Sequence, residues 1–88
     1  MPKNDKREFL SSLDPVATGI NLRELCAVHD ISATTLADRL GITVQSVYGW
    51  FSGTKQPSLD HMIEISGLLG VSIDEIVVKK TTGPYSEY

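Results

Sequence analysis

Polar side chains that can form hydrogen bonds gather in one short stretch, residues 44–52 (VQSVYGWFS). Val47, Trp50 and Phe51 stand there at i, i+3 and i+4, which places them on one face of a helix. Five of the other six residues are assigned to the outer surface of that helix: Val44, Gln45, Ser46, Tyr48 and Gly49. The stretch is therefore predicted to be a helix anchored by apolar residues, whose outer face offers an amide, a hydroxyl and a phenol to a partner.

Catalytic chemistry has much weaker support. Cys26 and His29 stand at i and i+3 and could touch, and such a pair can be nucleophilic, but no third orienting group or glycine-rich turn accompanies it. We predict a core cysteine beside a surface histidine. Nothing in the sequence resembles a P-loop, a dinucleotide fingerprint or a metal cluster. We therefore expect a protein that is not an enzyme and holds no cofactor or metal.

A second helix is predicted immediately before this stretch. Leu36, Ala37 and Leu40 stand at i, i+1 and i+4, which predicts a helix over residues 33–40. Side-chain oxygens can accept a backbone N–H at a helix start, and glycine takes the left-handed conformation that ends a helix. Three residues could supply these caps: Ser32, Gly41 and Thr43.

This pattern resembles the helix-turn-helix of the Cro/C1-type (phage-repressor-like, XRE) DNA-binding family. The family has a small residue in the first helix, a glycine four residues later and a β-branched residue six beyond that; Ala37, Gly41 and Val47 match this spacing. The resemblance continues at three further places: Gly53, Pro57 and residues 69–76 (LGVSIDEI). It implies a lambda-repressor-like fold and a sequence-specific, repressor-like transcriptional regulator.

The fold class predicted is all-α, a compact bundle of five short helices around the central helix-turn-helix. The predicted helices span residues 15–29, 33–40, 44–52, 59–69 and 73–77. Two of them have predicted inward stripes: Val16, Gly19, Leu22, Leu25, Cys26 and Val28 in the first, and Leu59, Met62, Ile63, Ile65, Ser66 and Leu69 in the fourth. Gly19 is expected where a neighbouring helix approaches closely, and His61 is expected to be exposed.

The chain of 88 residues is long enough for one small domain. We predict an N-terminal arm over residues 1–13, for which a short helix and a loose segment remain open, a DNA-binding domain over residues 14–78, and a flexible tail over residues 79–88. No apolar run approaches a membrane span, and the N-terminus lacks an apolar signal core. The expectation is a soluble cytoplasmic protein without a membrane partner.

The predicted helix over 44–52 fits the major groove of B-form DNA, which admits one α-helix and presents a distinct edge for each base pair. We expect Gln45 to pair with adenine N6 and N7. Ser46 would bond a base edge or a phosphate, and Val44 would pack on a thymine methyl. Tyr48 would reach a phosphate or a sugar, and Gly49 would reduce bulk near the groove. The alternative is a merely solvated face; the docking geometry of this motif class favours groove contact.

A separate set of residues is predicted to contact the DNA backbone. The N-terminus of the helix over 33–40 points free N–H groups and a positive dipole end outward, which suits an anion. The family commonly has a glutamine after this N-cap, and Thr34 stands in its place, so that contact would be shortened or absent. A solvated surface lysine is the alternative for Lys55. The whole predicted phosphate set is Ser32, Thr34, Thr35, Thr43, Lys55 and Gln56.

The charge balance counts against a nucleic-acid binder, because phosphate contacts normally require a basic surface. The formal net charge is −3. Between Ile20 and Lys80 the only cations are Arg23, Arg39, Lys55, Lys79 and Lys80. A homodimer would double the phosphate contacts and set two recognition helices about 34 Å apart. We therefore expect double-stranded DNA and a second copy of the chain as partners.

Two further departures from the family pattern bear on these expectations. Cys26 and Phe51 stand where the family often has a basic residue and a glutamate, and replacing an ion pair by apolar residues can be neutral or stabilising. The acidic balance and Thr34 motivate a rival hypothesis, a protein-interaction module that keeps the helix-turn-helix fold without binding DNA.

Overall fold

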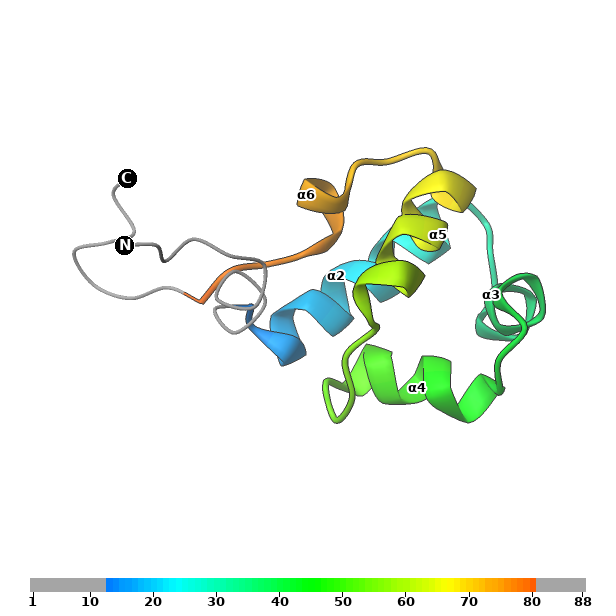
Figure 1. The fold of residues 1–88 in the computed structure, drawn as a ribbon, viewed down its shortest axis with the longest axis horizontal. Coiled ribbons are helices and arrows are strands. Elements are labelled where there is room, and N and C mark those ends of the chain that lie inside the picture. Colours follow the sequence, from blue (N-terminus) through cyan, green and yellow to red (C-terminus); the bar gives the residue numbers. More distant parts are fainter. Residues whose placement is uncertain (1–12, 81–88) are drawn as a thin grey trace.

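Five helices follow one another along residues 13–80, the part of the chain that the computed structural model describes (Figure 1). They are α2 (Pro15–Val28), α3 (Ala33–Leu40), α4 (Val44–Ser52), α5 (Leu59–Leu69) and α6 (Ile73–Ile76). The predicted all-α bundle is confirmed, and three of the helices begin and end at the predicted residues. Most of the predicted arm and tail, residues 1–12 and 81–88, lies outside the described residues.

Side-chain and glycine caps explain these boundaries, and those at Ser32, Gly41 and Thr43 were predicted. Asp14, Ser32, Thr43, Ser58 and Ser72 each accept a backbone N–H from the residue three positions later. At α6 the cap is reciprocal, since the Ser72 amide also donates to the Glu75 carboxylate at 2.8 Å. The left-handed φ of +71° at Gly41 lets the chain turn sharply from α3 towards α4. The first helix ends one residue earlier than predicted, because His29 is its C-cap.

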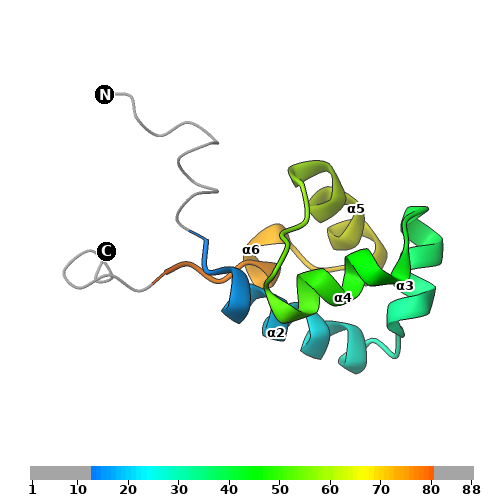
Figure 2. The same cartoon turned by 90° about the horizontal axis from the view of Figure 1, so that it is seen from below.

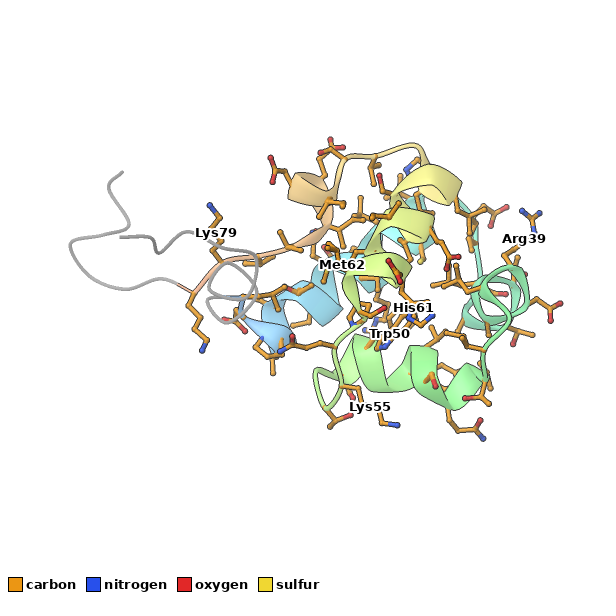
Figure 3. The ribbon with its side chains drawn as sticks, in the orientation of Figure 1. Arg39, Trp50, Lys55, His61, Met62 and Lys79 are labelled. Atoms are coloured by element: carbon orange, nitrogen blue, oxygen red, sulfur yellow. The ribbon has the colours of Figure 1, made fainter. Side chains whose placement is uncertain are left out.

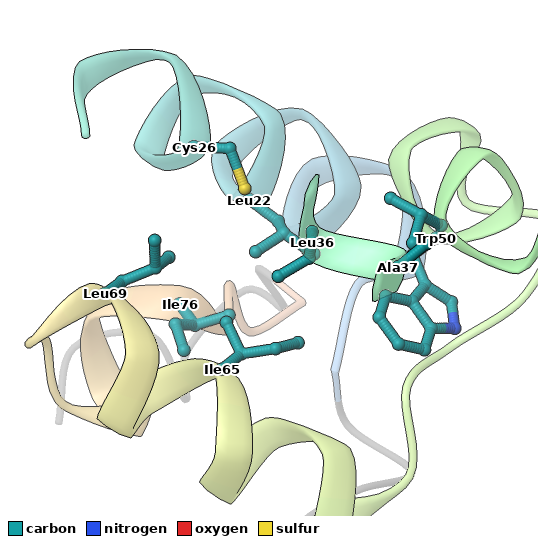
Figure 4. Close-up of a cluster of buried hydrophobic side chains, with 9 residues drawn as sticks. Leu22, Cys26, Leu36, Ala37, Trp50, Ile65, Leu69 and Ile76 are labelled. Carbon is teal, nitrogen blue, oxygen red and sulfur yellow. The ribbon is translucent and has the colours of Figure 1, made fainter. Parts of the chain in front are cut away.

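The core draws on all five helices and forms around the predicted helix-turn-helix residues (Figure 4). Its buried members are Leu22, Cys26, Leu36, Ala37, Val47, Trp50, Ile65, Leu69 and Ile76. A smaller cluster of Leu13, Met62 and Val77 lies under the ends of the described chain. Burial of this apolar surface is the main source of the bundle's stability.

A close backbone contact joins α2 to α4 at Gly19, as predicted. A Cβ atom at Gly19 would lie 2.6 Å from the Phe51 carbonyl oxygen and closer still to that of Trp50. Both obstacles are backbone atoms, which cannot rotate away. Glycine is therefore required where the two helices cross.

Three of the predicted inward residues are wrong. Val16 is 55% exposed and Val28 is 78% exposed, because each lies about 120° around α2 from the buried Leu22. Thr18, which was not predicted, is buried instead. Ile63 is also exposed, since its neighbour Met62 takes the core position on α5.

Polar contacts close the bundle by joining α2 to α6 and to the segment that follows α6. The Thr18 hydroxyl accepts from the Val78 amide at 2.9 Å and donates to the Val78 carbonyl at 3.3 Å. The Asn21 side-chain amide donates to the carbonyls of Glu75 and Ile76 at 2.7 and 2.9 Å.

The two ends of the described chain lie side by side. Leu13 and Lys79 form an isolated antiparallel bridge, and both stand just outside the predicted limits of the domain. Figures 1 and 2 show these ends together at the start of α2, at the opposite end of the molecule from α3. None of the helices in residues 13–80 has the length and apolarity needed to cross a bilayer.

Candidate nucleic-acid interface

Helix α4 lies at an edge of the molecule with one face against the core. Val47 and Trp50 are its buried residues, and α4 packs on α2 and α3. In Figure 1 the other described helices lie on one side of α4, and the opposite side carries no helix. The Trp50 ring also contacts the His61 ring, with centroids 5.3 Å apart, so His61 is half-buried where the sequence predicted exposure. The α4 helix is thus fixed in orientation while its outer face stays accessible.

The five predicted readout residues differ in how freely their side chains can reach a partner. Gln45 is exposed, and Tyr48 is 55% exposed with its ring edge against Phe51. Ser46 is half-buried, and its hydroxyl lies 3.0 Å from that of Thr43 within the helix cap. Of the predicted set, Gln45 and Tyr48 therefore offer the most accessible polar groups.

The other two predicted readout residues are partly covered. Val44 is half-buried and packs against the core. Gly49 is half-buried because the side chain of Lys55 lies over it. Part of Val44 remains exposed and accessible to a partner. At Gly49 the side chain of Lys55 covers the helix, so a partner there would meet Lys55.

The start of α3 carries three of the predicted phosphate residues. The Ser32 hydroxyl accepts the Thr35 amide at 3.1 Å and donates to the Thr35 hydroxyl at 3.0 Å, so both side chains are engaged in the cap. Thr34 is exposed beside them. The N–H groups of the first turn of α3 that the cap leaves unpaired give this end a partial positive charge.

Arg23 enters the sequence analysis only as one of five cations, whereas in the structure it lines a hollow beside the predicted phosphate residue Ser32. A hollow of about 410 Å³ lies between α2 and the start of α3, and Arg23, Asp30, Ser32 and Phe51 are among its lining residues. Arg23 thus brings a cation near the N-terminus of α3, although Asp30 lies in the same hollow. No local pattern could have indicated this, because the hollow depends on how the chain turns between the two helices.

The loop after α4 holds the remaining phosphate candidates. Lys55 and Gln56 are both exposed. The Lys55 amide donates to the Gly49 carbonyl at 3.1 Å, which folds the loop back against α4. Figure 3 shows Lys55 beside α4, on the side away from α5. The structure therefore places Lys55, a loop residue, beside the helix that carries Gln45.

The surroundings of Cys26 and His29 do not favour a nucleophilic pair. Cys26 is buried in the core, as predicted, and burial raises the pKa of its thiol, which disfavours the reactive thiolate. His29 is exposed at the end of α2, and no hydrogen bond joins the two side chains in the described structure. Residues 13–80 also contain no group of three or more His, Cys, Asp or Glu residues that could hold a metal ion.

Two acidic residues lie away from α4. Asp74 and Glu75 stand on α6, which Figure 1 shows at the opposite edge of the molecule. These two charges therefore stand on the far side of the bundle from α4 (Figure 1). Salt screens exposed charges that lie more than about 8–10 Å apart.

Comparisons with known proteins agree on this architecture. A helix-turn-helix family model matches residues 22–76. The uncharacterized HTH-type transcriptional regulator YobD of Bacillus subtilis (strain 168) is 34% identical over 56 residues, which cover 64% of this chain and 50% of that protein. The chain thus spans half the length of this relative.

Solved structures show the same fold. The restriction-modification controller protein C.AhdI from Aeromonas hydrophila is 30% identical and superposes with a TM-score of 0.66, over 72% of this chain and 96% of that one. A structure of HppE in complex with substrate gives a TM-score of 0.71 at 21% identity, over 80% of this chain and 39% of that one. The last likeness concerns the fold alone, so activity must be argued from the residues.

Proposed function

The chain belongs to the Cro/C1-type (XRE) helix-turn-helix family, and on that premise we propose that it is a sequence-specific, repressor-like transcriptional regulator that binds double-stranded DNA. The observation that carries the proposal is the division of α4. Val47 and Trp50 anchor one face in the core, and Gln45 is exposed on the other. A helix held in this way fits the major groove, where base edges can be distinguished.

In this proposal α4 enters the groove with its N-terminal residues deepest. Gln45 pairs with an adenine through its amide, and Tyr48 reaches the sugar or phosphate at the edge of the groove. Val44 and Ser46 contribute at the entry of α4, and Gly49 lies behind them.

The start of α3 and the loop after α4 bind the DNA backbone on the two flanks of α4. The first-turn amides of α3 receive one phosphate, with Ser32, Thr34 and Thr35 around it. Lys55 and Gln56 contact another, and Thr43 contributes from the turn before α4. Phosphate contacts set the register of the protein on the duplex, and base contacts set its sequence preference.

We also propose that the chain binds DNA as a homodimer in the cytoplasm. The chain from Ile20 to Lys80 holds only five Lys and Arg residues, and Lys55 is the one in the predicted phosphate set. A monomer would therefore bind weakly. Two copies on adjacent half-sites double the phosphate contacts and read two major grooves about 34 Å apart.

Selection from a random pool of duplex DNA at low salt tests the function directly. The wild-type chain should enrich a two-fold symmetric site, and Gln45→Ala should weaken binding to that site by about 1–3 kcal/mol while relaxing the preference at one base pair per half-site. Unchanged preference in Gln45→Ala would remove Gln45 from the readout. Failure to enrich any site would reject the function.

A protein-interaction module is the second candidate, favoured by the net charge of −3 and by Thr34 in place of the family's glutamine. It predicts a protein partner whose binding is lost on substitution of Gln45 or Tyr48, together with no shift on any DNA of the pool. The two measurements separate the candidates.

A further inference from the structure

The Lys55 side chain occupies the space that a side chain at position 49 would fill. A Cβ atom built on Gly49 would lie 3.2, 3.3 and 3.4 Å from Cδ, Cγ and Cβ of Lys55. These separations are tighter than ordinary van der Waals contact. The methylene groups of Lys55 therefore pack directly on the bare backbone of α4.

The loop that carries Lys55 is also fastened to Gly49. The Gly49 carbonyl accepts hydrogen bonds from the Lys55 amide at 3.1 Å, from the Ser52 hydroxyl at 3.1 Å and from the Thr54 hydroxyl at 3.3 Å. Gly53 allows the reversal with a φ of +83°. Both the backbone and the side chain of Lys55 are thus held against a single residue of α4.

This contact lies on the face of α4 that carries the exposed Gln45. Gln45 and Gly49 are four residues apart, so they are neighbours along one side of the helix. Val47 and Trp50 occupy the opposite, buried side. Lys55 therefore lies along the outer face of α4, beside Gly49 (Figure 3).

We propose that Gly49 is a positioning residue for Lys55, and that the two together hold one ammonium group against a DNA phosphate at the edge of the groove. The inference rests on the proposed function and deepens it. A free lysine side chain loses rotamer freedom when it binds a phosphate, whereas a side chain already packed on Gly49 loses less. The absence of a side chain at position 49 leaves room for the Lys55 side chain to pack on α4, and Gly49 itself makes no base contact.

The salt dependence of DNA binding tests this arrangement, with fluorescence anisotropy on the selected site as the measurement. Each neutralised phosphate contributes about 0.9 to the slope of log K against log salt. Lys55→Ala should lower that slope by about 0.9 per bound chain, or about 1.8 for the proposed dimer, so that its affinity for the two-fold site falls about 12-fold less than wild type between ~50 and ~200 mM salt. Gly49→Leu, whose side chain displaces the lysine, should lower the slope by a similar amount.

The double variant Gly49→Leu with Lys55→Ala distinguishes two possible roles of Gly49, positioning Lys55 and making room for DNA in the groove. If Gly49 acts through Lys55, the double variant has the slope of Lys55→Ala alone. If Gly49 only makes room for DNA, Gly49→Leu weakens binding equally with and without Lys55 and leaves the slope unchanged, which would overturn the inference. Gly67→Leu is the matched control, because a Cβ on Gly67 of α5 meets nothing within 4 Å.

The contact can also be measured without DNA. Nuclear Overhauser effects between the Gly49 α protons and the Lys55 β, γ and δ protons are expected in the wild-type chain, and their absence would overturn the positioning role. Gly49→Ala provides a milder variant should Gly49→Leu fail to fold, as judged by circular dichroism. A wild-type chain that binds no DNA would reject the proposed function, whereas DNA binding with a wild-type slope in Gly49→Leu would reject the inference alone.

Discussion

The α3–α4 pair and the closure that joins α2 to α6 and the segment after it are stabilised by different kinds of contact. In the α3–α4 pair each N-cap bonds a residue three positions away, as Ser32 does with Thr35 and Thr43 with Ser46. In the closure the bonding partners are 54 to 60 residues apart, as Thr18 is from Val78. The first region can form its local structure early, and the second forms only when the whole bundle is assembled.

Gly19→Ala should disrupt the close contact between α2 and α4, where the two regions meet. The added methyl group has no room between α2 and the Trp50 and Phe51 carbonyls, and backbone atoms cannot move aside without separating the helices. We expect a loss of about 3 kcal/mol in the free energy of unfolding, measured by chemical denaturation.

The control for this variant is Gly67→Ala at an open helical position, which should gain about 0.5–1 kcal/mol from helix propensity. Equal stability of the two variants would show that α2 and α4 do not cross as closely as described.

Thr18→Val should damage the closure and leave the α3–α4 pair intact. The isosteric change removes the hydroxyl that serves both polar groups of Val78 and leaves the Val78 amide without its acceptor. We expect a loss of about 2 kcal/mol in the free energy of unfolding. Hydrogen exchange should accelerate at the Val78 amide and stay slow in α4.

Thr34→Val, the same substitution at an exposed position of α3, is the matched control and should change stability by less than about 0.5 kcal/mol. Unaltered exchange at Val78 in Thr18→Val would contradict the role given to the hydroxyl.

Thr43→Ala should destabilise the protein less than Gly19→Ala or Thr18→Val, and only at the start of α4. The Thr43 hydroxyl accepts the Ser46 amide at 3.2 Å, and loss of such an N-cap costs about 1 kcal/mol. Fraying should be confined to the first turn of α4, where exchange of the Ser46 amide would accelerate while that of Val78 would not. A stability loss as large as that of Thr18→Val would show that the cap supports more than α4.

The sequence predicted all five helices because their signals are local. Apolar residues at i, i+3 and i+4 mark a helical face, and the caps at Ser32, Thr43 and Ser58 lie next to the turns that they stabilise. Predictions were wrong where a residue stands at the edge of an apolar face, as with Val16, Val28 and Ile63. Periodicity indicates the direction of a face, but the width of the buried part depends on which helix packs against it.

For the candidate interface, the sequence determined which residues α4 offers, since Gln45 and Tyr48 follow from the period of one helix. Only the tertiary structure decided that Lys55 lies over Gly49, that Arg23 lines a hollow beside Ser32, and that Thr18 bonds Val78. These contacts depend on how separate segments meet in space. Backbone direction after a turn, and the space left by a missing side chain, are properties of the assembled bundle that no short stretch of sequence specifies.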